Sequence, residues 1–414
     1  MSNNNLKKIS RGPTGIINIP PSKSISHRAV ICAALAGNKL DNFGINNLGE
    51  SEDIAATSSA IKQILEGNNN TPIDCGESGS TLRFLIPIAA MNGKEWHFIG
   101  KGRLMERPQT IYEDIFIEKN IRFEKGLDGI KIQGPLKGGE YHLPGDVSSQ
   151  FVSGLLFALS LANQDSEIKL TTPLESKDYV ELTIDVMHEF GVEVIKRTDD
   201  IGNVIGYSIA GGQKYLDVSF TVEGDYSQAA FFLCAAALGC EVAVAGLNKC
   251  SAQGDIRIID ILSIMGAKSS FMQDKSTNAD VIKITTPKNG LLATTIDAGD
   301  IPDIVPPLAA LSCYAKGTTH IVNAGRLRIK ESDRLHALAV ELSKLGADIK
   351  EEKDGLVITG KANLIGGSAD SHNDHRIAMS IALASLGCSQ KVFLSGSDCV
   401  SKSYPEFWDD WEKK

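Results

Sequence analysis

Basic residues in this sequence open helices that are otherwise apolar, and that placement suits anion binding. Lys23 and Arg28 lie in the first turns of one apolar segment, and Arg376 opens another. An unpaired charge inside an apolar helix is costly, so these side chains are expected to have partners or ligands. A helix N-terminus offers free N–H groups and partial positive charge, which attract anions. The pattern predicts sites for phosphate or carboxylate groups.

Two short polar segments add further basic residues. Arg binds carboxylate and phosphate groups through planar, paired contacts, whereas Lys acts as a point charge and a possible acid. Such a collection implies substrates that carry several negative charges. Nucleotide-binding signatures of the types GxxxxGK[ST] and GxGxxG are missing. The segments are GRLMERP, with Arg103 and Arg107, and RLRIKESDR, with Arg326, Arg328, Lys330 and Arg334.

Length and composition narrow the class of protein. A chain of 414 residues is too long for one ordinary core, so two domains are expected. The formal net charge of −9 argues against a nucleic-acid partner. The cysteines show no Cys-x-x-Cys and no spacing suited to zinc, so they are expected to be buried, reduced thiols. The first residues lack the apolar core of a signal peptide, and no apolar stretch reaches the ~18 residues of a membrane span. A cytoplasmic protein is expected.

An internal repeat organises the chain. Six segments share one design, in which a capping-type polar start precedes a small-residue, apolar helix. Their bodies have no solvated face, so these helices are expected to be internal. The segments are SKSISHRAVICAALAG from Ser22, SGSTLRFLIPIAA from Ser78, SSQFVSGLLFALSLA from Ser148, DYSQAAFFLCAAALG from Asp225, DIVPPLAALSCYAKG from Asp303 and NDHRIAMSIALASLG from Asn373.

Between these segments lie amphipathic helices and short strands. Residues 332–347 repeat leucines at helical spacing and end in a glycine stop followed by a strand. Each repeat is therefore predicted to contain strands, one buried helix and one exposed helix. Three repeats in each half of the chain would make two similar domains. The alternative is that Ala-rich helices recur by chance, as they can in any α/β protein.

The motifs themselves resemble those of the enolpyruvyl transferases, and among these the branch that uses shikimate 3-phosphate. The likeness runs in the family order from residue 21 to residue 408. The segments that carry it are PSKSISHRA, GESGSTLRFL, ERP, VSSQF, EGDYSQAA, IPDIVPPLAALSCYAKGTT, RIKESDR, NDHRIAM and SKSYPEFW.

The resemblance implies an α/β fold of two similar domains. Each would contain three βαβαββ units in an inside-out α/β barrel, with the active site in the interdomain cleft. The first domain would be residues 22–224, and the second would combine 1–21 with 225–414. The chain would then cross between domains twice, near 21 and 224, forming a hinge.

The resemblance also assigns site residues, motif by motif. Asp303 and Glu331 fall at the family's acid–base carboxylates, and Lys23 is a further proton donor candidate. Phosphoenolpyruvate would be held by Lys23, Arg107, Gln150, Arg334, Arg376 and Lys402, with Gly79 lining its pocket. Shikimate 3-phosphate would be held by Ser24, Arg28, Ser148, Ser149, Ser176, Tyr179, Asp303 and Lys330.

Simpler interpretations exist for some of these residues. Ser148 and Ser176 could be plain helix caps, and Asp303 could merely cap its own helix. Arg83 is more typical of a supporting residue than of a ligand, so it is left out of the predicted site.

The implied reaction protonates the methylene carbon of phosphoenolpyruvate while the 5-hydroxyl of shikimate 3-phosphate attacks the adjacent carbon, and phosphate then leaves. It needs an acid, a base and cations, but no metal or organic cofactor. The partners would be these two small molecules, and the chain is expected to be a monomer.

Two other functions are weighed against this one. The sister transferase acting on UDP-N-acetylglucosamine has a cysteine in a loop before an Arg-Pro pair, whereas GKGRLMERP has none. A non-catalytic anion-binding or RNA-end-processing relative would explain the basic helix starts but not the paired carboxylates.

Overall fold

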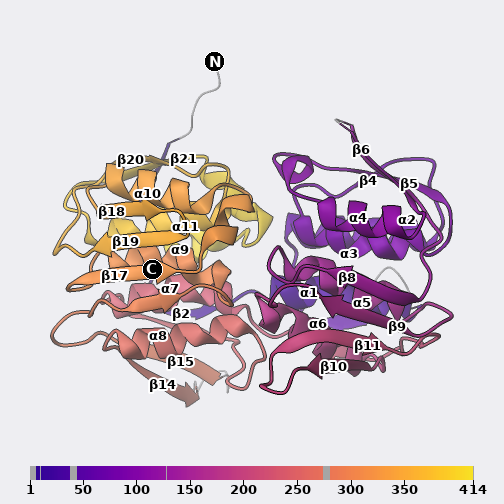
Figure 1. Ribbon diagram of the computed structural model, residues 1–414. Helices are drawn as coiled ribbons and strands as arrows, with labels where there is room; N and C mark the ends of the chain where they lie inside the picture. The colour runs from indigo at the N-terminus through magenta and orange to yellow at the C-terminus, as the bar shows by residue number, and fades with distance from the viewer. Residues whose placement is uncertain (1–5, 10, 38–43, 127, 274–279, 414) are drawn as a thin grey trace. The chain divides into compact units, whose positions relative to one another are not determined.

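Two parts of the chain fold as separate units in the computed structural model (Figure 1), which describes residues 6–9, 11–37, 44–126, 128–273 and 280–413. One unit, here called the split unit, combines Met1–Ser22 with Glu223–Lys414. The other, the continuous unit, is Lys23–Val222. The chain passes between them twice, at residues 22–23 and 222–223.

The repeat expected from the sequence appears in the continuous unit as one topology used twice. In each copy a buried helix joins two parallel strands, and an amphipathic helix then leads into an antiparallel hairpin. The sheet orders are β4-β5-β7-β6 and β8-β9-β11-β10. The first copy contains β4 (Ile73–Asp74), α3 (Gly79–Ala90), β5 (Glu95–Ile99), α4 (Thr110–Glu118), β6 (Arg122–Gly126) and β7 (Gly129–Gln133). The second contains β8 (Gly139–Leu143), α5 (Ser149–Leu159), β9 (Ser166–Leu170), α6 (Lys177–Glu189), β10 (Val194–Thr198) and β11 (Val204–Ile209).

The third repeat of the continuous unit is reduced. Its two helices are α1 (Lys23–Leu35) and α2 (Glu52–Leu65), which lie against each other. Its sheet, as far as the structure describes it, is a two-stranded parallel pair of β3 (Ile45–Asn46) and β12 (Phe220–Thr221). Strand β12 comes from the end of the unit and so closes it onto its beginning.

The split unit repeats the same topology. Two sheets have the orders β2-β13-β15-β14 and β16-β17-β19-β18, and a third, three-stranded sheet has the order β1-β21-β20. The first contains β2 (Gly15–Asn18), α7 (Tyr226–Ala237), β13 (Val242–Ala245), α8 (Ile258–Ile264), β14 (Lys268–Gln273) and β15 (Asp280–Thr285). The second contains β16 (Thr295–Asp297), α9 (Val305–Ser312), β17 (Thr318–Val322), α10 (Arg334–Lys344), β18 (Asp348–Glu352) and β19 (Gly355–Thr359). The third contains β1 (Lys7–Ile9), β20 (Gly367–Asp370), α11 (His375–Ala384) and β21 (Val392–Ser395), and α12 (Phe407–Trp411) follows it.

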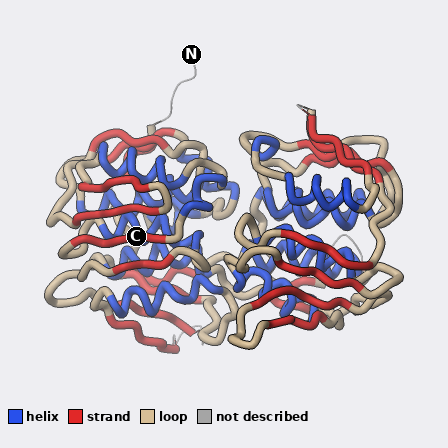
Figure 2. Tube along the Cα trace, in the orientation of Figure 1, coloured by secondary structure: helices blue, strands red, loops and turns tan. Residues whose placement is uncertain are grey.

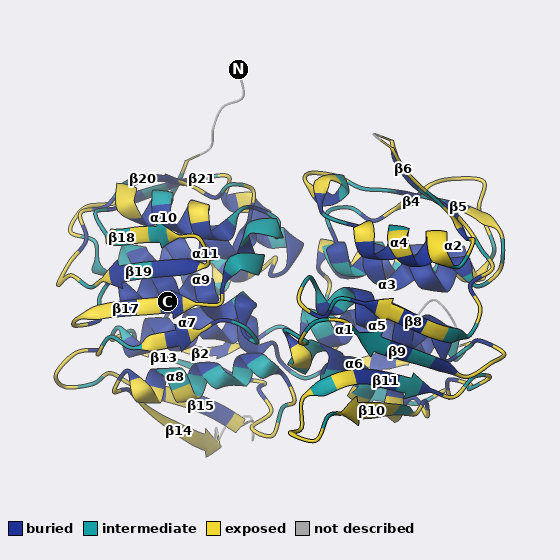
Figure 3. Ribbon diagram, viewed as in Figure 1, coloured by how far each residue is buried: buried dark blue, intermediate teal, exposed yellow. Residues whose placement is uncertain are grey.

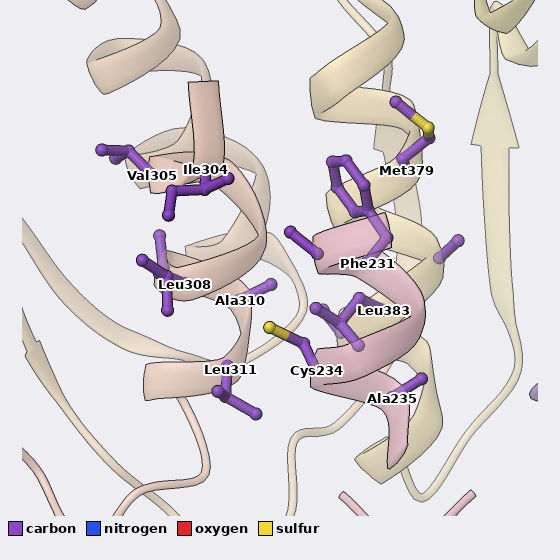
Figure 4. Packing of buried hydrophobic residues seen from close by; sticks show 14 of the residues in the cluster. Phe231, Cys234, Ala235, Ile304, Val305, Leu308, Ala310, Leu311, Met379 and Leu383 are labelled. Carbon is purple, nitrogen blue, oxygen red and sulfur yellow. The ribbon is translucent and has the colours of Figure 1, made fainter. Parts of the chain in front are cut away.

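The apolar helices form the interior, as their composition predicted. Every residue of α7 is buried, and α9 is buried along its whole length. Figure 2 shows these helices in blue between layers of red strands, and Figure 3 shows that their surfaces are dark, whereas α10 carries exposed residues. Figure 4 shows buried side chains of α7, α9 and α11 that belong to one cluster, among them Phe231 and Cys234 of α7, Leu308 of α9 and Leu383 of α11. Helices buried on all sides need no polar face.

Most of the predicted helix starts are confirmed. Ser78 accepts a hydrogen bond from the Thr81 N–H at 3.1 Å, and Asp225 accepts one from the Ser227 N–H at 2.8 Å. The sixth start is one residue later than predicted. The cap of α11 is Asp374 rather than Asn373, because Asn373 has left-handed backbone angles (φ 54°) that belong to a turn.

The fifth helix also starts later than predicted, so Asp303 is not its cap. Asp303 lies in a 3₁₀ turn, η3 (Pro302–Ile304), that precedes α9. Pro306 and Pro307 have no N–H group, so they cannot donate the α-helical hydrogen bonds to the carbonyls of Pro302 and Asp303. The tighter turn follows from those missing donors.

The expectations for the cysteines are confirmed only in part. All eight cysteines are free thiols, but Cys250 is exposed and Cys240 and Cys388 are half-buried, so the expectation of burial is wrong for these three. Within the part of the chain that the structure describes, every helix is too short or too polar to cross a bilayer.

Candidate functional site

Arg334 is the centre of a buried ion network in the split unit. Its Nε donates to Asp374 Oδ2 at 2.8 Å, its Nη1 to Asp303 Oδ1 at 3.1 Å, and its Nη2 to Glu331 Oε2 at 2.7 Å. The Arg334 residue is only 2% exposed. Burial alone would lower the pKa of this guanidinium, but the carboxylates of Asp374, Glu331 and Asp303 outweigh burial and raise the pKa. Arg334 therefore stays charged and fixed in position.

The carboxylate of Asp303 is shared by three cations. Besides Arg334, it faces Lys330 Nζ at 3.6 Å and Arg376 Nη2 at 3.4 Å. The backbone carbonyl of Asp303 accepts a further bond from Arg376 Nη1 at 2.7 Å. Arg376 is itself held by Ser227, whose Oγ accepts from Nη2 at 2.9 Å. The turn η3 therefore presents both its side chain and its main chain to basic residues.

Local sequence explains why these groups meet. Asp333 caps α10 by accepting from the His336 N–H at 3.1 Å, which places Glu331 and Arg334 on either side of the helix start. Asp374 caps α11 by accepting from the Arg376 N–H at 2.9 Å. Burial would raise the pKa of Asp374, but its contact with Arg334 is among the interactions that lower it overall. The starts of α10 and α11 are thus joined through one ionised carboxylate.

Lys402 approaches the same helix start from the end of the chain. It ends a 3₁₀ turn, η6 (Ser397–Lys402), and is buried. Its Nζ donates to the carbonyl of Asn373 at 2.7 Å. Lys402 is therefore positioned one residue from Asp374, the residue that holds Arg334.

In the continuous unit, Lys23 and Arg28 are held at the start of α1. Lys23 Nζ contacts Asp53 Oδ2 at 2.8 Å, which ties α1 to α2. Arg28 donates to the carbonyls of Ser24 and Tyr179 at 2.6 and 2.8 Å, and its Nε donates to a threonine hydroxyl of α6. Burial lowers the pKa of Arg28 to about 10, and nearby groups only partly offset this effect. A cation with that pKa is still protonated at neutral pH.

A second basic group lies at the start of α3. A Cβ atom added to Gly79 would lie 2.6 Å from Arg107 Nη1, so the missing side chain makes room for the guanidinium. Gln150 donates from Nε2 to the Ser80 hydroxyl at 2.9 Å and accepts from Arg83 Nη1 at 2.8 Å. The first turn of α3 thus brings together a helix N-terminus, Arg107 and an oriented amide, an arrangement that suits an anion.

The serines of the predicted site occupy different positions. Ser148 caps α5, and its Oγ accepts from the Gln150 N–H at 3.4 Å. Ser149 is the first residue of α5 and is buried. Ser176 precedes α6 in the left-handed region (φ 51°) and makes no side-chain cap bond, so the simple interpretation of Ser176 as a cap is wrong. A buried serine with positive φ is uncommon and is typical of functional sites.

The structure brings several of the predicted residues into contact within each unit. In the split unit Asp303, Lys330, Glu331, Arg334 and Arg376 form one network, which Lys402 joins through Asn373. In the continuous unit Ser24, Arg28 and Tyr179 form one group, and Gly79 lies against Arg107. Sequence reasoning missed Asp53, Asp374 and Ser227 as partners of these residues. Asp374 stood inside the NDHRIAM motif, and its position at a helix start was the available indication.

Comparisons with known proteins agree along nearly the whole chain. The family model described as EPSP synthase (3-phosphoshikimate 1-carboxyvinyltransferase) matches residues 8–69 and 61–411. The chain is 45% identical to the 3-phosphoshikimate 1-carboxyvinyltransferase of Clostridium perfringens, with 98% of each chain covered. It is 44% identical to the protein of the same name from Clostridium acetobutylicum, with 96% of this chain and 94% of that one covered.

Solved structures are similar as well. The EPSP synthase of Acinetobacter baumannii superposes with a TM-score of 0.75 at 25% identity, covering 97% of this chain and 96% of that one. The enolpyruvyl transferase NikO from Streptomyces tendae has a TM-score of 0.72 at 16% identity, covering 99% of this chain and 97% of that one, which bears on the fold alone.

Proposed function

The chain belongs to the EPSP synthase (3-phosphoshikimate 1-carboxyvinyltransferase) family, and from that membership we propose how its residues carry out the reaction. The protein is a transferase of the shikimate pathway. It moves the enolpyruvyl group of phosphoenolpyruvate to shikimate 3-phosphate and releases phosphate. The expected α/β fold of the enolpyruvyl transferases is the fold of this chain.

The reaction requires two proton movements of opposite sense. In the addition step, a proton joins the methylene carbon of phosphoenolpyruvate and the 5-hydroxyl oxygen bonds to the adjacent carbon, losing its own proton. In the elimination step, the new methyl group gives up a proton, the double bond re-forms and phosphate leaves. One group must therefore donate and one must accept in each step.

We assign these proton movements to Asp303 and Glu331. Three cations contact Asp303 and hold its carboxylate in position, and we assign this carboxylate to accept the hydroxyl proton. Glu331 contacts Arg334 at 2.7 Å within the same network, and we assign it to protonate the methylene carbon. Lys23 stays the other candidate donor. The Asp303–Glu331–Arg334 cluster is the observation that carries this proposal.

The cations are assigned to the substrates. Lys23, Arg107, Arg334, Arg376 and Lys402 would bind phosphoenolpyruvate, with Gln150 and Gly79 beside it. Support comes from the gathering of Arg107 and Gln150 at the start of α3, where backbone N–H groups add to the field. The residues assigned to shikimate 3-phosphate are Ser24, Arg28, Ser148, Ser149, Ser176, Tyr179, Asp303 and Lys330. Both units contribute to this assignment, so turnover should depend on both.

The choice of acceptor tests the proposed function. We expect phosphate release from phosphoenolpyruvate with shikimate 3-phosphate and none with UDP-N-acetylglucosamine. The segment from Gly100 to Pro108 has no thiol, so an epoxide mimic of the donor should leave the protein active. Turnover with the UDP-sugar, or a covalent adduct formed with time, would contradict the assignment. Equilibrium sedimentation would check the expected monomer.

A further inference from the structure

A buried carboxylate outside the predicted site holds the turn that leads into it. Glu341 lies on α10, two turns after Arg334, so the two side chains leave the same face of the helix. Glu341 is fully buried. Burying a carboxylate is costly unless several donors satisfy it, so a position of this kind calls for a physical reason.

Three donors surround Glu341, and two of them belong to one short segment. Oε1 accepts from His372 Nε2 at 2.7 Å and from Lys344 Nζ at 2.8 Å. Oε2 accepts from the backbone N–H of Asp370 at 3.0 Å. Glu341 therefore fixes Asp370, the last residue of β20, and the side chain of His372, which follows it.

The segment that Glu341 fixes has a demanding backbone. His372 and Asn373 are both left-handed, with φ of 51° and 54°. Two such residues in succession persist only where the surroundings determine them. Here the His372 N–H donates to Asp370 Oδ1 at 2.7 Å, and the Asn373 N–H donates to the Ser371 hydroxyl at 3.2 Å.

This turn contacts two residues that are predicted to bind phosphoenolpyruvate. The Asn373 carbonyl accepts from Lys402 Nζ at 2.7 Å, and Asp374 holds Arg334 at 2.8 Å. Helix α10 thus contacts the segment 370–374 at two points. Arg334 binds the last residue of the segment, and Glu341 binds the side chain and backbone nearer its start. A change in the turn would move Lys402 and the cap of α11 together.

On the premise of the proposed function, we propose that Glu341 and His372 are positioning residues for phosphoenolpyruvate. They act through the left-handed turn, which sets the places of Lys402 and Asp374. Neither residue needs to touch a substrate. A purely structural role, in which Glu341 only pins β20 to α10, would lower stability without favouring one substrate over the other.

The test compares two variants that cut the same contact. Glu341→Gln keeps the shape but replaces one acceptor oxygen with a donor, and His372→Gly keeps the freedom to be left-handed but removes the ring. Each should raise the KM for phosphoenolpyruvate roughly tenfold while the KM for shikimate 3-phosphate stays within about twofold. The double variant should be no worse than the more affected single variant, because both remove one contact.

Lys344→Gln is the matched control. Lys344 also contacts Glu341, but it lies on α10 and half of its side chain is exposed. Its removal should leave both KM values within about twofold. If Glu341→Gln does not fold, the KM values for phosphoenolpyruvate of His372→Gly and Lys344→Gln still test the proposal.

The outcomes separate this inference from the proposed function. A wild-type protein without turnover on both substrates would overturn the function and the inference with it. Normal wild-type turnover, with the KM for phosphoenolpyruvate unchanged in both Glu341→Gln and His372→Gly, would overturn the inference alone. Equal rises in both KM values, or additive effects in the double variant, would also overturn it.

Discussion

The two units hold their basic residues in different ways. In the split unit, Arg334 and Arg376 are bound by the carboxylates of Asp303, Glu331 and Asp374. These contacts largely cancel the charge of the guanidinium groups, but they also keep carboxylates fixed beside them. That arrangement suits proton transfer, because it holds acid–base groups in place within a balanced network.

In the continuous unit, neutral oxygens bind Arg28 and Arg83, although Lys23 pairs with a carboxylate. Arg28 donates to two backbone carbonyls and a hydroxyl, and Arg83 donates to Gln150 and to the carbonyl of Pro108. A neutral acceptor orients a guanidinium without cancelling its charge. We infer a division of labour in which both units supply cations for anion binding and the split unit adds the acid–base carboxylates.

Removing one arginine from each unit should produce the largest contrast, in stability. Arg334→Met leaves three carboxylates without their shared partner, and breaking a buried ion network costs about 3–5 kcal/mol. Arg28→Met leaves only neutral acceptors unsatisfied, which costs about 1–3 kcal/mol. Calorimetry of the two variants would measure the difference. Equal losses of unfolding free energy in the two variants would contradict the distinction between charged and neutral partners.

Arg376→Ala should give the next largest effect, on substrate affinity. Loss of a charge-assisted contact is worth about 1.5–3 kcal/mol, so the KM for phosphoenolpyruvate should rise roughly 10- to 100-fold. The KM for shikimate 3-phosphate should change far less. Arg328→Ala is a suitable control, because Arg328 pairs with Asp333 and Glu351 and is assigned to neither substrate. If Arg376→Ala raises both KM values equally, the assignment to the donor is wrong.

Gly79→Ala should have a smaller effect, confined to the continuous unit. The new methyl group would meet Arg107 Nη1, the flexible tip of a side chain that can move away. Stability should therefore hardly change, whereas displacement of the guanidinium should raise the KM for phosphoenolpyruvate about tenfold. Steady-state kinetics with thermal melting would check both parts. An unchanged KM would mean that Arg107 does not bind the donor.

The helices were largely predictable because their starts depend on neighbours in sequence. Ser78 and Asp225 cap within three residues of themselves, and the apolar bodies that follow have to be buried. The exact start of α9 was not predictable from the capping pattern alone, because Pro306 and Pro307 delay it. The overall topology came from the resemblance to a family rather than from local pattern.

The partners of the site residues were harder to predict than the residues themselves. Lys23 meets Asp53 across 30 residues of sequence, and Arg334 meets Asp374 across 40. Such pairs depend on how helices pack, which no local pattern encodes. The burial of Glu341 could not be predicted for the same reason, because in the sequence Glu341 is one of several charged residues on an amphipathic helix. The roles assigned to these residues stay predictions.

Deuterium uptake tests the division of labour most directly. In deuterium oxide, the addition step gives the methyl carbon one solvent deuteron, and elimination leaves part of it in the methylene group of the product. The measurement is the rate of this uptake at saturating substrates in the wild-type protein, Glu331→Gln and Lys23→Gln. We predict that Glu331→Gln slows uptake about 10²–10⁴-fold and that Lys23→Gln slows it less than about tenfold. The reverse order would place the proton donor in the continuous unit and contradict the account.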